Sequence, residues 1–348
     1  MTARPADQQK LPKKERKALA RELARLQRER EARRRRRNRR LGWAGAGTGA
    51  VAAGVVAVLL VQASVRAGQV GPLGMLSDGV VLSGDGSTVS VVPTDAIPAG
   101  SAPVATAVDR TSGVLDLVLY VDYRSPEAAA LWQADGSEIA QWVTAGNATL
   151  EVHPLALLDG TTVAAPSAST TASPEPSASA TTTPATVTTG DYSLRAAGAL
   201  ACVADGQPDA VLAVHEALLA AQPGLDADGL DDDELVALVQ DAGARDDAVA
   251  DCVRSGGFTD WAREATDRAA DSVPFDVGSV TTSPVLLVGG RAYTGALDDP
   301  AALSTFVTEV AGQLAAAAAA QASASPSASP TPTPSASPSA SPSAEPAD

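Results

Sequence analysis

The chain has 348 residues, of which 45% are hydrophobic and only 3% are aromatic. Its charge is divided, because residues 1–40 hold 17 of the 26 Lys and Arg residues, and the other 308 carry 9 basic and 36 acidic side chains. That acidic remainder would repel phosphate, so we expect no nucleic-acid partner. Two cysteines exclude a zinc ribbon, and the distant His153 and His215 argue against a histidine-based metal centre. We therefore expect no metal and no cofactor.

Residues 1–40 form a basic arm, and the uncharged apolar stretch 41–65 follows it. These 25 residues, at ~1.5 Å per helical residue, are long enough to cross a hydrocarbon core of ~30 Å. The positive-inside rule then predicts a single-pass cell-membrane protein with a cytoplasmic arm and an extracytoplasmic C-terminal part. We also expect the arm to contact anionic lipid head groups. A cleaved signal peptide ending near Ala67 is the alternative, which the long polar leader disfavours.

Residues 160–190 and 320–348 are rich in Ser, Thr, Pro and Ala and contain almost no large apolar side chain. Such segments cannot bury enough surface to offset the entropy lost on ordering, so both are predicted to be disordered. Extracytoplasmic tracts of this composition often carry O-linked sugars or act as stalks, and a plain spacer is the alternative. The foldable material is therefore 66–159, 191–272 and 273–319.

The first foldable part is predicted to contain mostly strands. Val80–Val92 consists of two β-rich runs around a Gly-Asp-Gly turn and predicts a hairpin. Val114–Val121 is an apolar run typical of a buried strand, and Thr149–His153 predicts another. Between them, Glu127–Gly146 is predicted to be a helix, with a kink expected at Gly136.

The later parts are predicted to be mainly helical. The expected helices of the middle part are 191–204, 209–221, 231–242, 246–254 and 258–270. After them, Val285–Val288 and Arg291–Tyr293 predict a second hairpin around two glycines, and Asp299–Ala319 predicts a final helix. The order is thus two strands, a strand, a helix, a strand, a block of helices, two strands and a helix.

This order resembles the DsbA-like branch of the thioredoxin fold, in which a helical block is inserted between the two halves. Leu119–Ala128 (LYVDYRSPEA) is similar to the strand-to-helix segment in which that family carries its Cys-x-x-Cys motif. Thr282–Val285 resembles the element whose proline is cis and faces the active site, and Leu286–Arg291 resembles the hairpin that follows. Tyr192–Val203 and Asp251–Trp261 are similar to the helical insert of membrane-anchored bacterial thiol-disulfide oxidoreductases.

The resemblance implies an α/β, thioredoxin-like fold with an inserted helical subdomain, preceded by one transmembrane helix and carrying disordered Ser/Thr/Pro-rich segments. Residues 66–159 would form the first part of the thioredoxin-like domain together with an N-terminal hairpin. Residues 191–272 would form the helical insert, and residues 273–319 the second part of the domain.

The motif itself is replaced by Ser125-Pro126-Glu127-Ala128, with Ser125 and Ala128 at the positions of the attacking and resolving cysteines. In the family, the attacking thiol lies at a helix N-terminus, which stabilises its thiolate. A serine cannot form a mixed disulfide, so the sequence excludes thiol–disulfide exchange here and predicts no catalytic residue. Serine followed by proline is instead typical of a helix start. A serine nucleophile of another kind is the alternative, which lacks a Gly-x-Ser-x-Gly elbow.

Cys202 and Cys252 are the only cysteines, and each lies in a predicted helix of the insert. Outside the membrane oxidation is favoured, so we predict a structural disulfide between them. The alternative is a relocated redox pair, but the spacing is not that of a Cys-x-x-Cys motif.

Two other groups are interpreted as structural. Asp226–Glu234 suggests a calcium loop, but Leu230 stands at its fifth position, so the EF-hand ligand pattern fails and the acids are assigned to a helix start. His215 shares a helical face with Leu218 and Leu219, which favours a buried histidine with satisfied hydrogen bonds over a metal-ligating one.

Three hypotheses of function remain. The first is a non-catalytic, chaperone-like binding module of the cell envelope, with Ser125, Ser283 and Pro284 as binding residues and with extended peptides or envelope proteins as partners. In it, the residue before the proline offers backbone hydrogen bonds to an extended peptide. The second is a protein with residual or partner-dependent redox function through Cys202 and Cys252. The third is an architectural spacer of the envelope.

Overall fold

The computed structural model describes residues 71–164, 185–275 and 277–324. The chain divides into two units, Met1–Gly68 and Gln69–Asp348, and all of the described residues belong to the second. The predicted arm 1–40 and the predicted membrane helix 41–65 lie outside the described residues, as do most of the spacer and the C-terminal tail.

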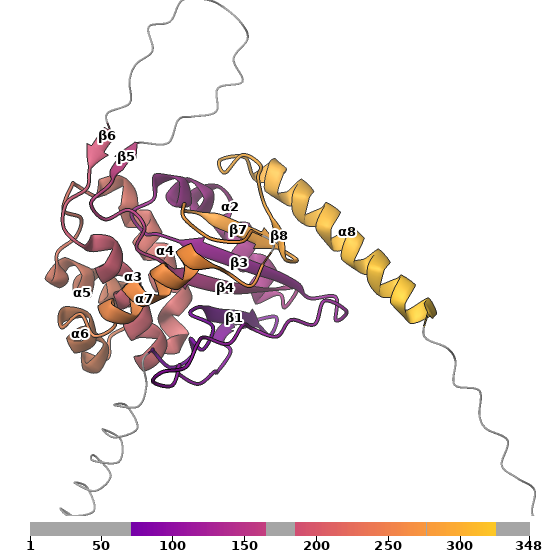
Figure 1. Cartoon of the computed structure of the whole chain (residues 1–348), viewed down its shortest axis with the longest axis horizontal. Coiled ribbons are helices and arrows are strands. Elements are labelled where there is room, and N and C mark those ends of the chain that lie inside the picture. Colours follow the sequence, from indigo (N-terminus) through magenta and orange to yellow (C-terminus); the bar gives the residue numbers. More distant parts are fainter. Residues whose placement is uncertain (1–70, 165–184, 276, 325–348) are drawn as a thin grey trace, which may run out of the picture. The chain divides into compact units, whose positions relative to one another are not determined.

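A six-stranded mixed sheet forms the centre of this unit, in the order β2-β1-β4-β3-β7-β8 (Figure 1). β3 and β4 pair in parallel, and every other neighbouring pair is antiparallel. All seven residues of β3 are buried, as expected for a central strand whose two faces are both covered. The strands are β1 (Val80–Gly84), β2 (Val89–Val91), β3 (Leu115–Val121), β4 (Ala148–Pro154), β7 (Val285–Val288) and β8 (Arg291–Ala292).

Helix α2 (Pro126–Thr144) connects the two parallel strands and packs its apolar side chains into the main core. The kink predicted at Gly136 is absent, because α2 runs as one uninterrupted helix. Gly136 has a different role. The indole of Trp132 lies against it so closely that a Cβ atom there would come within 2.7 Å of Trp132 Nε1. The glycine thus makes room for a tryptophan one turn earlier.

The helical insert lies beside one end of the sheet (Figure 1). Helix α3 is its centre and packs against α4, α5, α6 and α7. Eleven residues of α3 are buried, and many are alanines, whose small side chains allow the surrounding helices to approach closely. The insert helices are α3 (Tyr192–Gly206), α4 (Val211–Ala221), α5 (Asp232–Asp241), α6 (Asp247–Arg254) and α7 (Thr259–Asp271), with short 3-10 turns at Pro208–Ala210 and Gln222–Gly224.

The spacer begins and ends in ordered structure. Strand β5 (Thr162–Ala164) pairs with β6 (Ala185–Val187) in an antiparallel ribbon. Next to it, the buried Thr188 donates its hydroxyl proton to Leu158 O at 2.6 Å. The segment 160–190, predicted to be disordered, therefore forms a paired ribbon at its two ends, where β-branched residues favour strand pairing.

Helix α8 (Pro300–Ala324) closes the fold and ends five residues later than predicted. Leu303 and Val310 are buried in the core, and Phe306 and Leu314 pack against it. Residues Pro300–Ser323 are also long and apolar enough to cross a membrane by length and composition, as no other helix among the described residues is. The buried side chains show that the first half of α8 is part of the folded core.

Candidate functional site

The candidate site forms where β3 ends, α2 begins and the chain bends before β7. The Ser283–Pro284 peptide bond in this bend is cis, as the resemblance implies. The backbone N–H of Asp122 donates to Ser283 Oγ at 2.7 Å, and Ser125 Oγ donates to the carbonyl oxygen of Ser283 at 2.8 Å. The turn and the bend, 158 residues apart in sequence, are therefore in direct contact.

Ser125 is the N-cap of α2, as predicted. Its hydroxyl oxygen accepts a hydrogen bond from the backbone N–H of Ala128 at 3.1 Å, and Pro126 occupies the first helical turn. The hydroxyl has one proton, and the carbonyl of Ser283 is nearer than the carboxylate of Glu127, which lies at 3.3 Å. Ser125 is fully buried, and among the described residues no histidine hydrogen-bonds to it. In the described part of the chain, the contacts of the Ser125 hydroxyl are those of a helix cap.

The site contains no sulfur. Ala128, which the resemblance places at the resolving position, is buried and contributes only its backbone N–H. Cys202 and Cys252 form a disulfide that joins α3 to α6, with a Cα–Cα distance of 5.8 Å, as predicted. Because these are the only cysteines of the chain, no free thiol is left for exchange.

A buried carboxylate lies behind the site. Asp122 follows β3 directly and accepts hydrogen bonds from the backbone N–H groups of Leu157 at 2.6 Å, Leu158 at 2.9 Å and Arg124 at 2.8 Å. Burial raises the pKa of Asp122 to about 6, although these N–H groups favour its charged form. Asp122 is not among the site residues predicted from the sequence. An acid directly after a buried strand, in the sequence Val121-Asp122-Tyr123, was the available signal.

Arg124 attaches the site to the helical insert. Its guanidinium is buried and donates to the backbone carbonyls of Asp226 at 3.3 Å, Ala227 at 3.1 Å and Asp228 at 3.2 Å. In return, the Gln222 side chain donates to the carbonyl oxygen of Arg124 at 3.1 Å. In Asp226–Glu234, the segment with the incomplete calcium-loop pattern, the first three carbonyl oxygens thus accept hydrogen bonds from Arg124.

His215 is buried, as predicted, but only its Nδ1 atom has a hydrogen-bond partner, and its buried Nε2 atom has none among the described residues. Tyr123 Oη lies 2.9 Å from its Nδ1 atom, and the ring of Trp132 meets it edge-on at 4.3 Å. Burial lowers the pKa of His215 to about 3, so the ring carries no charge near neutral pH. Within residues 71–164, 185–275 and 277–324, no group of three His, Cys, Asp or Glu side chains is arranged to hold a metal ion.

The backbone before β7 is open. Strand β7 is paired on both sides, by β3 and β8. The N–H groups of Thr281, Thr282 and Ser283, by contrast, donate no hydrogen bond to any described residue. Thr281 and Thr282 are exposed, and Ser283 and Pro284 are half-buried. Three successive backbone N–H groups without a partner among the described residues therefore adjoin the bend that Ser125 contacts.

No known protein family and no curated protein matches the chain. Among solved structures, it is similar to the reduced form of the disulfide bond oxidoreductase DsbG from Mycobacterium tuberculosis, at 24% identity and a TM-score of 0.44, over 70% of this chain and 94% of that one. It is similar to reduced DsbA from the same organism at 23% identity and a TM-score of 0.44, over 69% and 99%. It is also similar to MdbA, a thiol-disulfide oxidoreductase from Corynebacterium diphtheriae, at 17% identity and a TM-score of 0.43, over 66% of this chain and 93% of that one.

The sheet order, the parallel β3-α2-β4 unit, the cis-proline before β7 and the helices between the two halves define a DsbA-like thioredoxin fold. The predicted α/β, thioredoxin-like fold with an inserted helical subdomain is confirmed, and the transmembrane helix at 41–65 stays a prediction because it lies outside the described residues.

Proposed function

We propose that the protein is a membrane-anchored, non-catalytic module of the cell envelope that binds extended segments of other proteins. In this account, residues 41–65 anchor it, the basic arm is cytoplasmic and the thioredoxin-like domain is extracytoplasmic. The domain keeps the scaffold of a thiol-disulfide oxidoreductase, with Ser125 and Ala128 at the positions of its two cysteines.

The absence of a free thiol supports a non-redox role. Disulfide exchange requires a thiolate that attacks and a second sulfur that resolves the mixed disulfide. Here the hydroxyl of Ser125 is committed to Ala128 N and to the carbonyl of Ser283. Cys202 is only 2% exposed and bonded to Cys252, so the chain's one pair of cysteines is a cross-link within the insert.

The observation that carries the proposal is that the backbone N–H groups of Thr281, Thr282 and Ser283 donate no hydrogen bond to any described residue. An extended peptide that lies beside this stretch would accept hydrogen bonds from its free N–H groups, as in recognition by strand addition. Ser125 holds the neighbouring bend in place by donating to the carbonyl of Ser283. The serine thus has a positioning role where the family has a reactive one.

Hydrogen–deuterium exchange tests the proposal on the full chain in phosphatidylcholine nanodiscs. The probe is reduced, carboxymethylated α-lactalbumin, an unfolded polypeptide without free thiols. We expect slower exchange over residues 281–283 when the probe is added, and no insulin-reducing activity with or without it. Absence of binding, or protection confined to other segments, would favour the architectural spacer instead.

A backbone variant sharpens this test. Thr282→Pro removes one N–H group without changing charge and should weaken probe binding about threefold to tenfold, the equivalent of one hydrogen bond. Val108→Pro is the matched control, because Val108 is exposed in a loop and its N–H group also donates to no described residue. Equal binding by both variants, with unchanged unfolding midpoints, would overturn the assignment of this stretch as the binding edge.

A further inference from the structure

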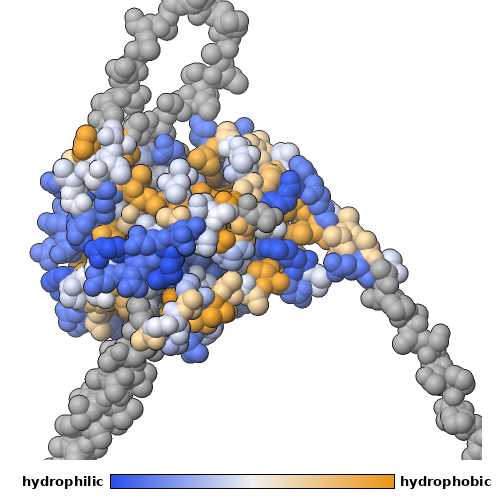
Figure 2. Space-filling model, in the orientation of Figure 1, coloured by the Kyte–Doolittle hydropathy of each residue, from blue (hydrophilic) through white to orange (hydrophobic). Residues whose placement is uncertain are grey.

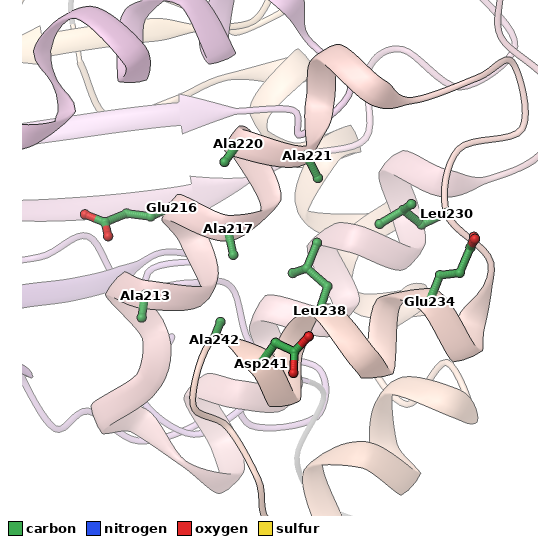
Figure 3. A pocket seen from close by; sticks show the side chains of 10 residues that line it. All are labelled: Ala213, Glu216, Ala217, Ala220, Ala221, Leu230, Glu234, Leu238, Asp241 and Ala242. Atoms are coloured by element: carbon green, nitrogen blue, oxygen red, sulfur yellow. The ribbon is translucent and has the colours of Figure 1, made fainter.

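An open groove of about 720 Å³ runs between helices α4 and α5 of the insert (Figure 3). Five alanines form much of its lining, and Leu230 and Leu238 contribute the larger apolar side chains. Figure 3 shows Leu238 directed from α5 toward the alanines of α4. The groove involves no residue of the bend at Ser283, so binding in the groove is independent of the proposed function.

Both helices present one face to the groove. On α4, Ala213, Ala217 and Ala220 are spaced by four and three residues, and on α5 the same spacing relates Glu234, Leu238 and Asp241. Residues at these intervals lie on one side of a helix, one above the other. The α4 face is therefore small and apolar, and the α5 face has one leucine between two acids.

Three carboxylates frame the apolar surface: Glu216 on α4, and Glu234 and Asp241 toward opposite ends of α5 (Figure 3). No basic side chain lines the groove. The side chains of Glu216 and Asp241 form no ion pair and no hydrogen bond with any described residue. Partial burial raises the pKa of Glu216, in keeping with its lack of an ion pair among the described residues.

The wider surface has the same sign. The insert, residues 191–272, carries 18 acidic and 5 basic side chains. In the view of Figure 2, hydrophilic residues cover much of the part of the molecule that these helices form. Such a field attracts cationic partners and repels anionic ones, including nucleic acids and acidic membranes.

The geometry favours a helix over an extended peptide as occupant. An extended peptide needs unpaired backbone as a partner, but the walls of the groove are helices whose N–H and C=O groups are paired within α4 and α5. A helix satisfies its own backbone, and small side chains on the receiving surface allow it to approach closely.

We propose that this groove binds a basic amphipathic helix of a partner protein. Its leucine or alanine face contacts Ala217 and Leu238, and two Lys or Arg side chains seven residues apart lie opposite Glu234 and Asp241. Seven residues correspond to about 10 Å along a helix, which matches the same interval between the two acids on α5. A third cation faces Glu216.

A designed peptide tests the proposal on the full chain in phosphatidylcholine nanodiscs. The probe is a fluorescent synthetic helix of about 20 residues of Leu, Ala and Lys, with two lysines seven positions apart at one edge of its leucine face and a third lysine at the other edge. The control peptide has the same composition, with the lysines moved to the opposite face. We expect the probe to bind more tightly than the control, and more weakly as salt rises from about 0.05 M to about 0.5 M. Equal binding of the two peptides, or no binding of either, would overturn the proposal.

Variants locate the binding. Glu216→Gln combined with Asp241→Asn should weaken binding of the probe about threefold to tenfold at low salt. Asp267→Asn with Asp271→Asn is the matched control, because it makes the same change in charge on exposed side chains of α7 that have no ion pair. Ala220→Trp, at an exposed position of α4, should block the groove and weaken binding at any salt. Equal losses of affinity in both double variants would show that the peptide is attracted by net charge alone and would refute specific binding in the groove. Binding of carboxymethylated α-lactalbumin at 281–283 is measured separately and tests the proposed function.

Discussion

Replacing Ser125 by alanine tests the contact between the helix start and the cis-proline bend. The hydroxyl makes two hydrogen bonds in a fully buried position, accepting from Ala128 N at 3.1 Å and donating to Ser283 O at 2.8 Å. Ser125→Ala removes both bonds. It leaves one N–H group of α2 and the carbonyl of Ser283 without these partners, and it adds no new atom to the site.

The expected loss is the sum of the two bonds. Removing an N-cap serine costs about 1 kcal/mol, and removing one buried neutral hydrogen bond costs about 1 kcal/mol more. We therefore expect Ser125→Ala to lower the free energy of unfolding by about 2 kcal/mol. Helix α2 stays in place, since its apolar side chains remain in the main core.

Urea denaturation followed by circular dichroism measures this loss on the full chain. Ser272→Ala is the matched control, because Ser272 is exposed after α7 and its hydroxyl makes no hydrogen bond with a described residue. It should change stability by less than about 0.5 kcal/mol. If Ser125→Ala lowered the free energy of unfolding no more than the control does, the hydroxyl would not hold the turn against the bend, and the proposed contact would be refuted.

Three other perturbations test the disulfide of the insert, the contacts of Arg124 and a buried carboxylate of α2. Replacing Cys202 and Cys252 together by alanine removes a cross-link between positions 50 residues apart and should cost about 2–4 kcal/mol in urea unfolding; no loss would contradict the disulfide. Arg124→Met deprives three carbonyls at 226–228 of their donor and should speed hydrogen exchange in that loop, whereas unchanged exchange would show that Arg124 is not its anchor. Asp135 is buried, neither carboxylate oxygen has a hydrogen-bond partner, and burial raises its pKa to about 6. Its protonated form stabilises the fold below about pH 4, and that stability is lost as the pH rises through about 6, so Asp135→Asn should reduce the fall in unfolding free energy over this range by on the order of 2 kcal/mol. Parallel pH profiles of the variant and the natural protein would contradict this assignment.

Features set by neighbouring residues could be predicted from the sequence. Ser125 followed by proline specifies the start of α2, and Asp231 with Glu234 forms a capping box at the start of α5. The apolar run of β3 likewise predicts a buried strand, and the two cysteines of the insert predict the disulfide. For these elements, local preference and global fold agree.

Contacts that join segments distant in the sequence could not be predicted in this way. Asp122 is fixed by N–H groups 35 and 36 residues later, and Arg124 by carbonyls more than 100 residues away. No sequence motif at Asp122 or Arg124 indicates which distant residues each one contacts. The ribbon β5–β6 pairs two short runs of low-complexity sequence across an intervening stretch. Gly136 is typical of a helix break in the sequence, whereas in the structure it makes room for the indole of Trp132. In each case tertiary packing overrides the local signal.

Restoring the sulfur tests the central claim most directly. The claim is that the start of α2 is the reactive position of an oxidoreductase scaffold whose chemistry has been removed. Ser125→Cys combined with Ala128→Cys places two thiols at the N-terminus of α2, where the free N–H groups and the helix dipole stabilise a thiolate. The account predicts that this variant catalyses the reduction of insulin by dithiothreitol, whereas the natural protein and Ala128→Cys alone do not. Inert thiols in the double variant, with the pKa of an ordinary free cysteine near ~8.5, would contradict it.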